Sequence, residues 1–301
     1  MIPYTKKLDA ATYHADREFA GPTLSASTAA TLTRQSPLHA WLHHPRLGGI
    51  PKDATAEMDR GTLIHAVVFG QGMPVEIIDA ANYRAKAAQE KRDAAREAGK
   101  VPLLMREYDG LLAEGVEIRC EIEAALRLTL DPAAAETAIF WQETFEPQLH
   151  GERIMGEAVT IQCRGMMDHH WMNQSACVIL DLKTCQSAHP RAIQSHVMQY
   201  GYDIQAAAYT SAVEKLRPDL AGRIDFVWAF AEILPPGSPR RAVVTVARPS
   251  GEMMELGRRK WERACRTWAA CLASDTWPGP ADSAVVLEPP AWAMAEEESF
   301  Q

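Results

Sequence analysis

The order of hydrophobic and polar positions divides the chain into a helical first part and a second part rich in strands. After Pro132, three segments combine β-branched, aromatic and alternating apolar residues, which predicts strands with tight connections. Two helical stretches and two further strands follow them. The expected strands lie within 138–145, 153–172, 176–184, 223–234 and 240–248, and the helices at about 189–198 and 203–216. This succession predicts an α/β protein with a central mixed β-sheet flanked by helices.

Capping residues and breakers bound the helices expected in the first part. A helix is expected from about Ser27, with Ser25 or Ser27 as its cap. The apolar segment MDRGTLIHAVVF predicts a short helix that Gly70 closes. Residues 80–130 predict two helices with a break near 99–102. The first of these is basic and lacks an apolar stripe, so it is either a solvated helix or an arm that faces phosphates.

The chain has 301 residues, which is enough for one large domain or two small ones. We expect a single domain, because the elements follow one another as in one α/β core with an inserted helical segment. Its expected parts are N-terminal helices (24–70), the inserted basic segment (80–130), the sheet core (138–248), a long amphipathic C-terminal helix (249–273) and a Pro-rich, extended tail that ends acidic (274–301).

Composition narrows the class of protein. Hydrophobic residues make up 47% and charged residues 23%, as in ordinary soluble proteins. No apolar run is long enough for a membrane span, and the first residues lack the apolar region of a signal peptide. The six cysteines form no CxxC pair, which argues against a zinc or iron–sulfur site and suits a reducing cytosol. The net charge of −8 speaks only weakly against nucleic acid, since a metal-binding carboxylate cluster and a small basic groove can coexist on an acidic chain.

The segment VILDLKT places two opposite charges at the end of a buried strand. Alternate strand residues share a face, so Asp181 and Lys183 point one way and Leu182 points the other way. A hairpin through the turn at 172–175 could bring Asp168 beside Asp181. Two adjacent carboxylates repel each other unless a cation lies between them, and oxygen ligands select Mg²⁺ or Mn²⁺. A lysine beside such an ion predicts metal-assisted phosphodiester hydrolysis, although an exposed ion pair at a strand end is the alternative for this tripeptide alone.

Three further features bear on that choice. Glu143 lies in the expected strand before Asp168, inside the otherwise apolar FWQETF. Gln205 and Tyr209 are four positions apart and share a helix face, which is also usual at an amphipathic boundary. His65 is a lone polar residue in TLIHAVVF, where a core histidine is an equally good explanation.

Taken together and in order, these residues resemble the PD-(D/E)xK nuclease superfamily. The pattern H…E…GxxD…DxK…QxxxY is similar to its RecB-type branch, and within it to the RecE-like (exonuclease VIII) nucleases and their phage relatives. The segments LSASTAATLTRQSPLHAW, GTLIH, AREAGKVPLLMREYDGL and WPGP with PPAWA resemble further parts of that family, so that the likeness covers nearly the whole chain. Departures are Met166 and Met167 before the hairpin aspartate, and Pro280 where an aromatic residue often follows the glycine.

The resemblance implies a role for each matching residue and a restriction-endonuclease-like core. His65, Asp168, Asp181 and the Leu182 carbonyl resemble metal ligands. Lys183 resembles the catalytic lysine, and Glu143 resembles an acidic position near the metals. Gln205 and Tyr209 resemble the pair that steadies DNA near the scissile phosphate, and Arg164 is a further candidate for DNA contact. A neutral His65 ligand predicts that activity falls as pH drops through the ordinary histidine range.

The function implied by this resemblance is a Mg²⁺-dependent exodeoxyribonuclease, for which Mn²⁺ can substitute. Such an enzyme would degrade the 5′ strand at double-stranded DNA ends and leave 3′ overhangs for a single-strand annealing protein. A ring-shaped homo-oligomer, no membrane partner, and a cytoplasmic location (the bacterial host cytosol for a phage-encoded protein) are expected with it. Two alternatives stay open: a RecB-type nuclease that acts on single strands or flaps, and a catalytically inactive DNA-binding module.

Overall fold

A mixed β-sheet forms the centre of the protein in the computed structural model, which describes residues 2–51, 54–149, 152–153, 157–234, 242–281 and 283–298. Six strands follow one another across it in the order β1-β5-β8-β9-β10-β11, and β2 pairs in parallel with β8. The strands of this sheet are β1 (Tyr4–Lys7), β2 (Leu24–Ser25), β5 (Ala135–Phe145), β8 (Val159–Met172), β9 (Cys177–Cys185), β10 (Ile224–Glu232) and β11 (Val244–Ala247). The α/β fold with a central mixed sheet is therefore confirmed.

The predicted hairpin joins β8 to β9. Its turn is held by the Asn173 side-chain oxygen, which accepts the backbone N–H groups of Ser175 at 2.7 Å and Ala176 at 3.0 Å. The antiparallel register pairs Met172 with Cys177 and His169 with Leu180. Asparagine is common in such turns because its side chain can replace backbone hydrogen-bond partners. The short turn thus sets the register of both strands.

A helical crossover makes the sheet mixed. After β9 the chain passes through α7 (Pro190–Tyr200) and α8 (Tyr202–Leu216) and returns as β10, which runs parallel to β9. Such a connection is needed because β9 ends at one edge of the sheet and its parallel neighbour β10 begins at the opposite edge. The expected PPGSP turn between β10 and β11, at 235–239, lies outside the described residues.

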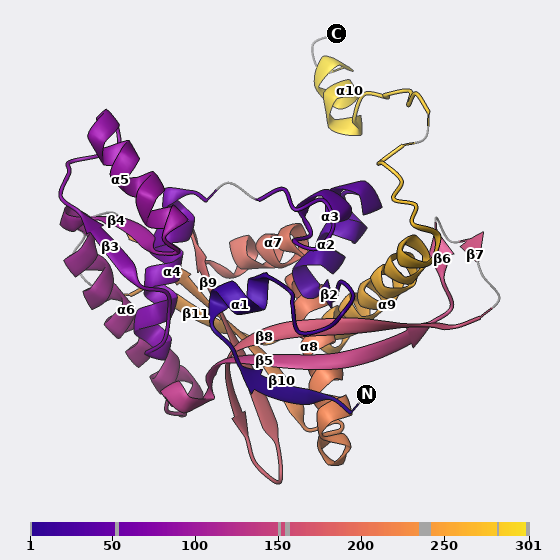
Figure 1. The fold of residues 1–301 in the computed structure, drawn as a ribbon, viewed down its shortest axis with the longest axis horizontal. Coiled ribbons are helices and arrows are strands. Elements are labelled where there is room, and N and C mark those ends of the chain that lie inside the picture. Colours follow the sequence, from indigo (N-terminus) through magenta and orange to yellow (C-terminus); the bar gives the residue numbers. More distant parts are fainter. Residues whose placement is uncertain are drawn as a thin grey trace.

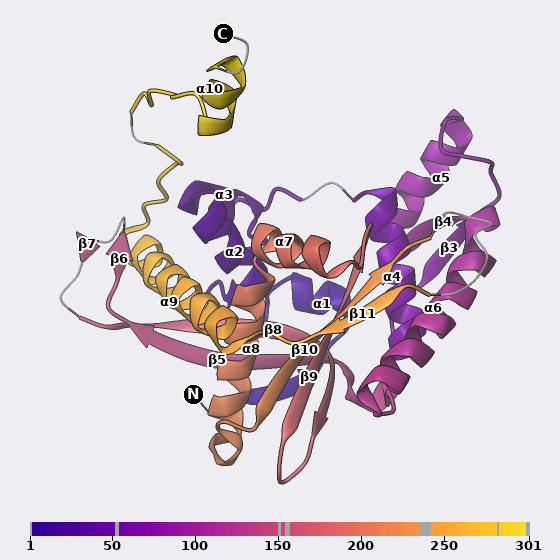
Figure 2. The ribbon, with the colours of Figure 1, turned by 180° about the vertical axis from the view of Figure 1, so that it is seen from behind.

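Helices cover both faces of the sheet, as Figures 1 and 2 show. One core contains apolar residues of β5, β8 and β10 together with α2 (Ala26–Arg34), α8 and α9 (Gly251–Ser274). The other contains Leu180 and Leu182 of β9 with α4 (Ala56–Phe69) and α6 (Met105–Leu126). Alternate residues of β9 thus enter different cores, as the strand periodicity requires.

The N-terminal helices begin and end at the expected signals. The Ser25 hydroxyl accepts the Thr28 N–H at the start of α2, and Gly70 ends α4 in the left-handed conformation with φ of 69°. Residues Pro37–His43 form α3, which begins at a proline, and Ala10–His14 form the short α1. Only glycine adopts such a positive φ without steric cost, which is why it often ends a helix.

The inserted segment contains two strands in addition to its two helices. Helices α5 (Lys86–Glu97) and α6 flank β4 (Val101–Leu104), which pairs in parallel with β3 (Val75–Ile78). The predicted break near 99–102 is therefore a strand, in which Val101 and Leu103 are buried. Short apolar runs such as VPLL cannot be assigned by periodicity alone.

The C-terminal tail is only partly extended. Within 275–281 and 283–290 the structure describes no helix or strand, and Ala291–Glu298 form α10. Figures 1 and 2 show α10 apart from the sheet and its covering helices. The remaining short elements are β6 (Gln148–Leu149), β7 (Glu152–Arg153), and 3₁₀ turns at Pro132–Ala134 and Pro218–Leu220. Within the described ranges, no helix is both long and apolar enough to cross a membrane.

Candidate active site

Three acidic residues lie side by side on neighbouring strands. In the β5–β8 pair, Ala135 faces His169 and Thr137 faces Met167, so the register places Glu136 opposite Asp168. In the β8–β9 hairpin the pairing ends at His169 and Leu180, and Asp168 and Asp181 are the next residues of the two strands. The sheet therefore arranges Glu136, Asp168 and Asp181 as one row across β5, β8 and β9.

Glu136 interrupts the regular strand geometry. Its φ is 48°, in the left-handed region that residues with a Cβ rarely adopt. Such a conformation costs free energy and is often found at functional sites, where the surrounding structure holds it in place. This backbone conformation changes the direction of one carboxylate within an otherwise regular antiparallel pair of strands.

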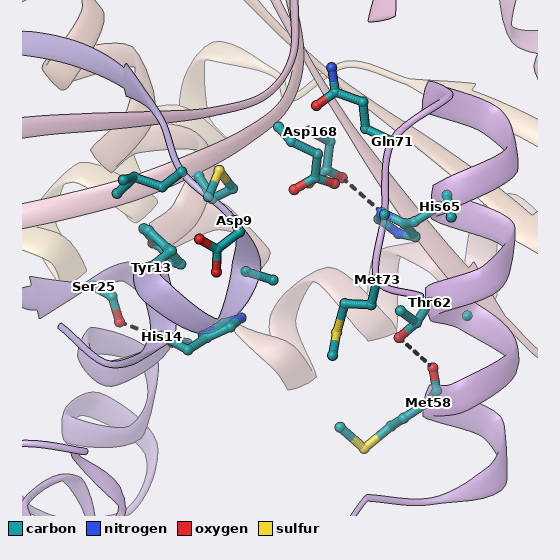
Figure 3. Close-up of a pocket in the computed structure, with 18 of the residues that line it drawn as sticks. Asp9, Tyr13, His14, Ser25, Met58, Thr62, His65, Gln71, Met73 and Asp168 are labelled. Atoms are coloured by element: carbon teal, nitrogen blue, oxygen red, sulfur yellow. Dashed lines mark hydrogen bonds and ion pairs between the residues drawn. The ribbon is translucent and has the colours of Figure 1, made fainter. Parts of the chain in front are cut away.

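His65 approaches the row from α4. Its Nδ1 lies 3.7 Å from Oδ2 of Asp168, and Figure 3 shows the two side chains facing each other. One ligand atom from each of His65, Glu136 and Asp168 lies within 4.8 Å of the others, which is the geometry of a possible metal site. Helix α4 thus places an imidazole nitrogen beside two carboxylates, so His65 is not an isolated core histidine.

Lys183 and Gln205 hold Asp181. The Lys183 Nζ lies 2.7 Å from Oδ2 of Asp181, and the Gln205 Nε2 donates to Oδ1 at 2.6 Å. The same Nζ lies 4.7 Å from the centre of the Tyr202 ring. Asp181 and Lys183 share a face of β9 as the sequence predicts, and α8 closes over that face.

Leu182 links the second core to the row of acids. Its side chain is buried with α4 and α6, while its backbone N–H donates to Oδ2 of Asp168 at 2.8 Å. The Leu182 backbone tends to raise the pKa of the His65 imidazole, although burial outweighs this effect. It thus lies close to the candidate metal site, where the resemblance implies that its carbonyl is a ligand.

Burial sets the protonation of the site. It raises the pKa of Glu136 to about 7, with the nearby Asp168 acting in the same direction, and that of Asp181 to about 6 despite Lys183. Burial and the Lys183 charge lower the pKa of His65 to about 4. Burial alone would lower the pKa of the Lys183 ammonium, but Asp181 and Asp168 raise it above its ordinary value. Near neutral pH, His65 is thus neutral and Lys183 is charged.

The expected pH dependence therefore changes. A His65 with a pKa of about 4 stays neutral through the ordinary histidine range, so its protonation does not switch the site there. The Glu136 carboxyl, with a pKa of about 7, is the group that titrates near neutral pH. The sequence did not single out this residue.

These groups open into a cavity of about 1100 Å³. Figure 3 shows α4, with Met58, Thr62 and His65, on one side and the α1 region, with Asp9 and His14, on the other. The lining also includes Glu136, Asp168, Lys183, Gln205, Tyr200, Tyr202 and Tyr209. Glu136 and Asp168 are thus reachable from solvent, whereas Asp181 is buried behind them.

Glu143 does not lie at this site. It is 7% exposed, and its Oε1 accepts from Lys215 at 2.7 Å and from the Trp141 Nε1 at 3.0 Å. It is seven residues from Glu136 along β5, a separation of roughly 23 Å in a strand. The expectation that Glu143 lies near the metals is therefore wrong, and Glu136 occupies the corresponding place.

Arg164 is a structural residue. It is 5% exposed, its Nε lies 3.4 Å from Asp16, its Nη1 donates to the Tyr13 carbonyl, and its guanidinium stacks over the Tyr13 ring. It fastens α1 to the sheet, so the placement contradicts a direct contact with DNA. Nothing in the local sequence distinguishes a buried arginine from an exposed one.

Gln205 and Tyr209 do line the cavity from one face of α8. The Tyr209 hydroxyl accepts the Met166 backbone N–H at 3.1 Å, and its ring lies so close to Gly165 that a Cβ there would be 2.6 Å from a ring carbon. Gly165 therefore allows Tyr209 to reach the strand. Both residues position β8 and β9 at the site, and their contact with DNA stays a prediction.

The residues fit a divalent cation. One imidazole and two carboxylates form a mixed set of nitrogen and oxygen donors of the kind that holds a divalent cation. Burial, together with the nearby Asp168, raises the pKa of Glu136 to about 7 and so disfavours its ionised form when no cation is bound. His65, Glu136 and Asp168 would hold the ion, with Asp181 and the Leu182 carbonyl adjacent.

The fold and site are those of a PDDEXK-like protein. A sequence model of the PDDEXK-like domain of unknown function (DUF3799) matches residues 136–288, and the chain belongs to this family. No curated protein sequence matches the chain at a significant level.

A solved structure shares the fold. The chain is similar to a protein from Eubacterium rectale named a “putative exonuclease”, at 13% identity and a TM-score of 0.52, over 96% of this chain and 98% of that chain. A phage related exonuclease from Haemophilus somnus 129PT is 12% identical over 84% of this chain and 96% of that chain, with a TM-score of 0.30. The first likeness supports the fold, and we draw nothing from the second.

Proposed function

We propose that the protein is a metal-dependent exodeoxyribonuclease that hydrolyses phosphodiester bonds at duplex ends. The observation that carries this proposal is the row of Glu136, Asp168 and Asp181, with His65 on one side and Lys183 on the other. Partly buried carboxylates within 4.8 Å of one another are costly unless a cation balances them, so a merely structural origin is unfavourable. The membership in a PDDEXK-like family agrees with this chemistry.

The metal would act as a Lewis acid that activates a water and offsets charge on the phosphate. His65, Glu136 and Asp168 hold the ligand positions, and the hydrogen bond from the Leu182 N–H fixes one Asp168 oxygen. Gln205 holds Asp181 and so orients the strand end that carries Lys183. These contacts preorganise the site before substrate binds, which is the larger part of electrostatic catalysis.

Lys183 is the proposed catalytic cation. Its ammonium lies at the end of β9, 2.7 Å from Asp181, and lines the cavity. There it can orient the attacking water and offset negative charge that develops on the phosphate. Because its pKa is raised by the two aspartates, it stays protonated at neutral pH and acts as a cation rather than as a free base.

The substrate belongs to the proposal as well. Duplex ends, degradation of the 5′ strand, a homo-oligomeric ring and a partner that anneals single strands come from the resemblance to RecE-like nucleases. One solved relative in fold is named an exonuclease, which supports this choice among nucleases. The cavity of about 1100 Å³ is wide enough for a strand terminus.

One assay tests the function. Linear duplexes labelled at the 5′ or the 3′ end, and a covalently closed circle, are incubated with Mg²⁺, Mn²⁺ or a chelator. We expect metal-dependent loss of the linear duplex, early release of the 5′ label and an intact circle. Asp168→Asn is the matched control for a contaminating nuclease. No metal-dependent cleavage of any substrate by the wild type would refute the proposal, and early release of the 3′ label would refute its polarity.

A further inference from the structure

Two tyrosines flank Gly201 at the junction of α7 and α8. Gly201 has a φ of 72°, and a Cβ there would lie 2.8 Å from the Ala30 Cβ. The junction is thus a tight turn that only glycine fits. It brings Tyr200, the last residue of α7, and Tyr202, the first residue of α8, to the same side of the cavity.

The two rings form a stack that begins at the catalytic lysine. The Lys183 Nζ lies 4.7 Å from the Tyr202 ring centre, and the Tyr202 and Tyr200 rings are 5.6 Å apart at an interplanar angle of 26°. Phe230 packs beside Tyr202 at 6.3 Å, and His196 meets Tyr200 edge-on at 5.8 Å. An ordered aromatic series thus leads from the core past Lys183 to the cavity.

The outer ring is open to a ligand. The Tyr200 residue is 49% exposed although it lines the cavity, whereas Tyr202 is only partly accessible. The other face of this ring packs on Tyr202, which is the ring that contacts Lys183. An exposed aromatic ring thus lies one ring away from the ammonium that is proposed to meet the phosphate.

We infer that Tyr200, supported by Tyr202, is a stacking platform for one unpaired nucleobase of the strand whose phosphate lies at Lys183. This inference rests on the proposed function and deepens it. Aromatic side chains bind single-stranded bases through their flat faces with little sequence preference. Inside a duplex both faces of a base are already stacked, whereas a terminal or unpaired base offers a free face. The platform would therefore favour frayed or single-stranded termini.

The experiment compares base removal with ring removal. A short single-stranded oligonucleotide carries either its normal base or an abasic sugar at the terminal nucleotide or at the next one. Its affinity for the full-length protein is measured with Ca²⁺ in place of Mg²⁺, after a gel has shown that the oligonucleotide stays intact. The wild type should bind the normal form about tenfold more tightly than one of the two abasic forms.

Two substitutions at one position separate the ring from its bulk. Tyr200→Leu keeps apolar volume but has no aromatic face. The variant should therefore bind the normal and the abasic strands about equally well. Tyr200→Phe keeps the face and should keep the preference. Melting temperatures close to that of the wild type are expected for both, because the side chain is half exposed.

The outcomes separate this inference from the proposed function. Equal affinity of the wild type for normal and abasic strands overturns the platform, with no variant needed, and so does an unchanged preference in Tyr200→Leu. Metal-dependent cleavage by the same wild-type preparation leaves the proposed function standing in either case. A wild type that shows the base preference but cuts no DNA supports the platform and refutes the nuclease, and one that neither binds nor cuts refutes both.

Discussion

Strand β5 carries an acidic residue near each of its ends, and the two residues have opposite surroundings. Glu143 accepts hydrogen bonds from Lys215 and Trp141, and Trp261 lies 3.5 Å away, so that nitrogen donors surround one buried carboxylate. Glu136 instead lies opposite another carboxylate, in a left-handed backbone conformation, and its pKa is raised to about 7. At one end of the strand the carboxylate has its hydrogen-bond and charge partners, and at the other end it does not.

This difference shows which property of a buried acid indicates function. Glu143 is buried and Glu136 is partly exposed, and a buried charge with partners is compatible with a purely structural role. The informative observation at Glu136 is repulsion from a neighbouring carboxylate in a cavity, because such an arrangement needs a cation to be stable. Four predictions test the contrast, beginning with the largest expected effect.

Asp168→Asn should abolish cleavage, because it removes the acid at the centre of the row while the amide oxygen can still accept the Leu182 N–H. Relief of repulsion should leave the melting temperature of the metal-free protein unchanged or higher. Cleavage per folded molecule and thermal unfolding are measured on the same preparation. Asp181→Ala is a poorer test, because it leaves Lys183 and Gln205 without their acceptor. A well-folded Asp168→Asn protein with wild-type rates would remove the row from the active site.

Lys183→Ala should lower the single-turnover cleavage rate by about 10²-fold or more, the usual loss when one preorganised electrostatic group is removed. Lys183→Arg should not restore the rate, because a planar guanidinium does not replace a compact ammonium. DNA affinity and metal binding should be largely kept. The matched control is Lys215→Ala, which removes the cation that pairs with Glu143. If Lys183→Ala instead weakened binding and kept its single-turnover rate, Lys183 would be only a partner of Asp181.

Glu136→Gln should weaken Mn²⁺ binding by about tenfold or more, as expected when a ligand loses its charge. Glu143→Gln should leave Mn²⁺ binding unchanged and instead lower the free energy of unfolding by about 1–3 kcal/mol, since Lys215 loses its charged partner. Calorimetric titration and chemical denaturation of both variants measure the two effects. Equal effects on metal binding would mean that the two ends of β5 do not differ in function.

The smallest effect is a pH-dependent difference in stability. Because the folded-state pKa of Glu136 is raised to about 7, its neutral form stabilises the folded state at low pH, and this contribution is lost as pH rises through about 7. Glu136→Gln keeps a neutral side chain at every pH. Without metal, the variant should therefore melt a few degrees above the wild type at about pH 8 and near it at about pH 5. A difference that does not grow with pH would show that Glu136 is not destabilised in its ionised form.

Local signals determined much of this protein. The hairpin at 172–175 sets its own register, which is why the sequence alone could bring Asp168 beside Asp181. The two-residue period of β9 separated Asp181 and Lys183 from Leu182, and Gly70 ended α4 where a left-handed residue was needed. The α/β order of elements followed from the same periodicities. In each case the determining contacts lie within a few residues of one another.

The tertiary structure decided what depended on distant segments. The connection between β5 and β8 is long, so no turn residue reveals whether Glu136 or Glu143 lies opposite Asp168. Likewise, β1 pairs with β5 more than a hundred residues away, β3 pairs with β4 in the inserted segment, and α1 covers Arg164. The type of a residue shows which chemistry its side chain can perform. Strand register and helix packing across the whole chain decide which groups that side chain contacts. The sequence therefore predicted the lysine and two aspartates as site residues, whereas only the assembled sheet showed which glutamate lies opposite Asp168.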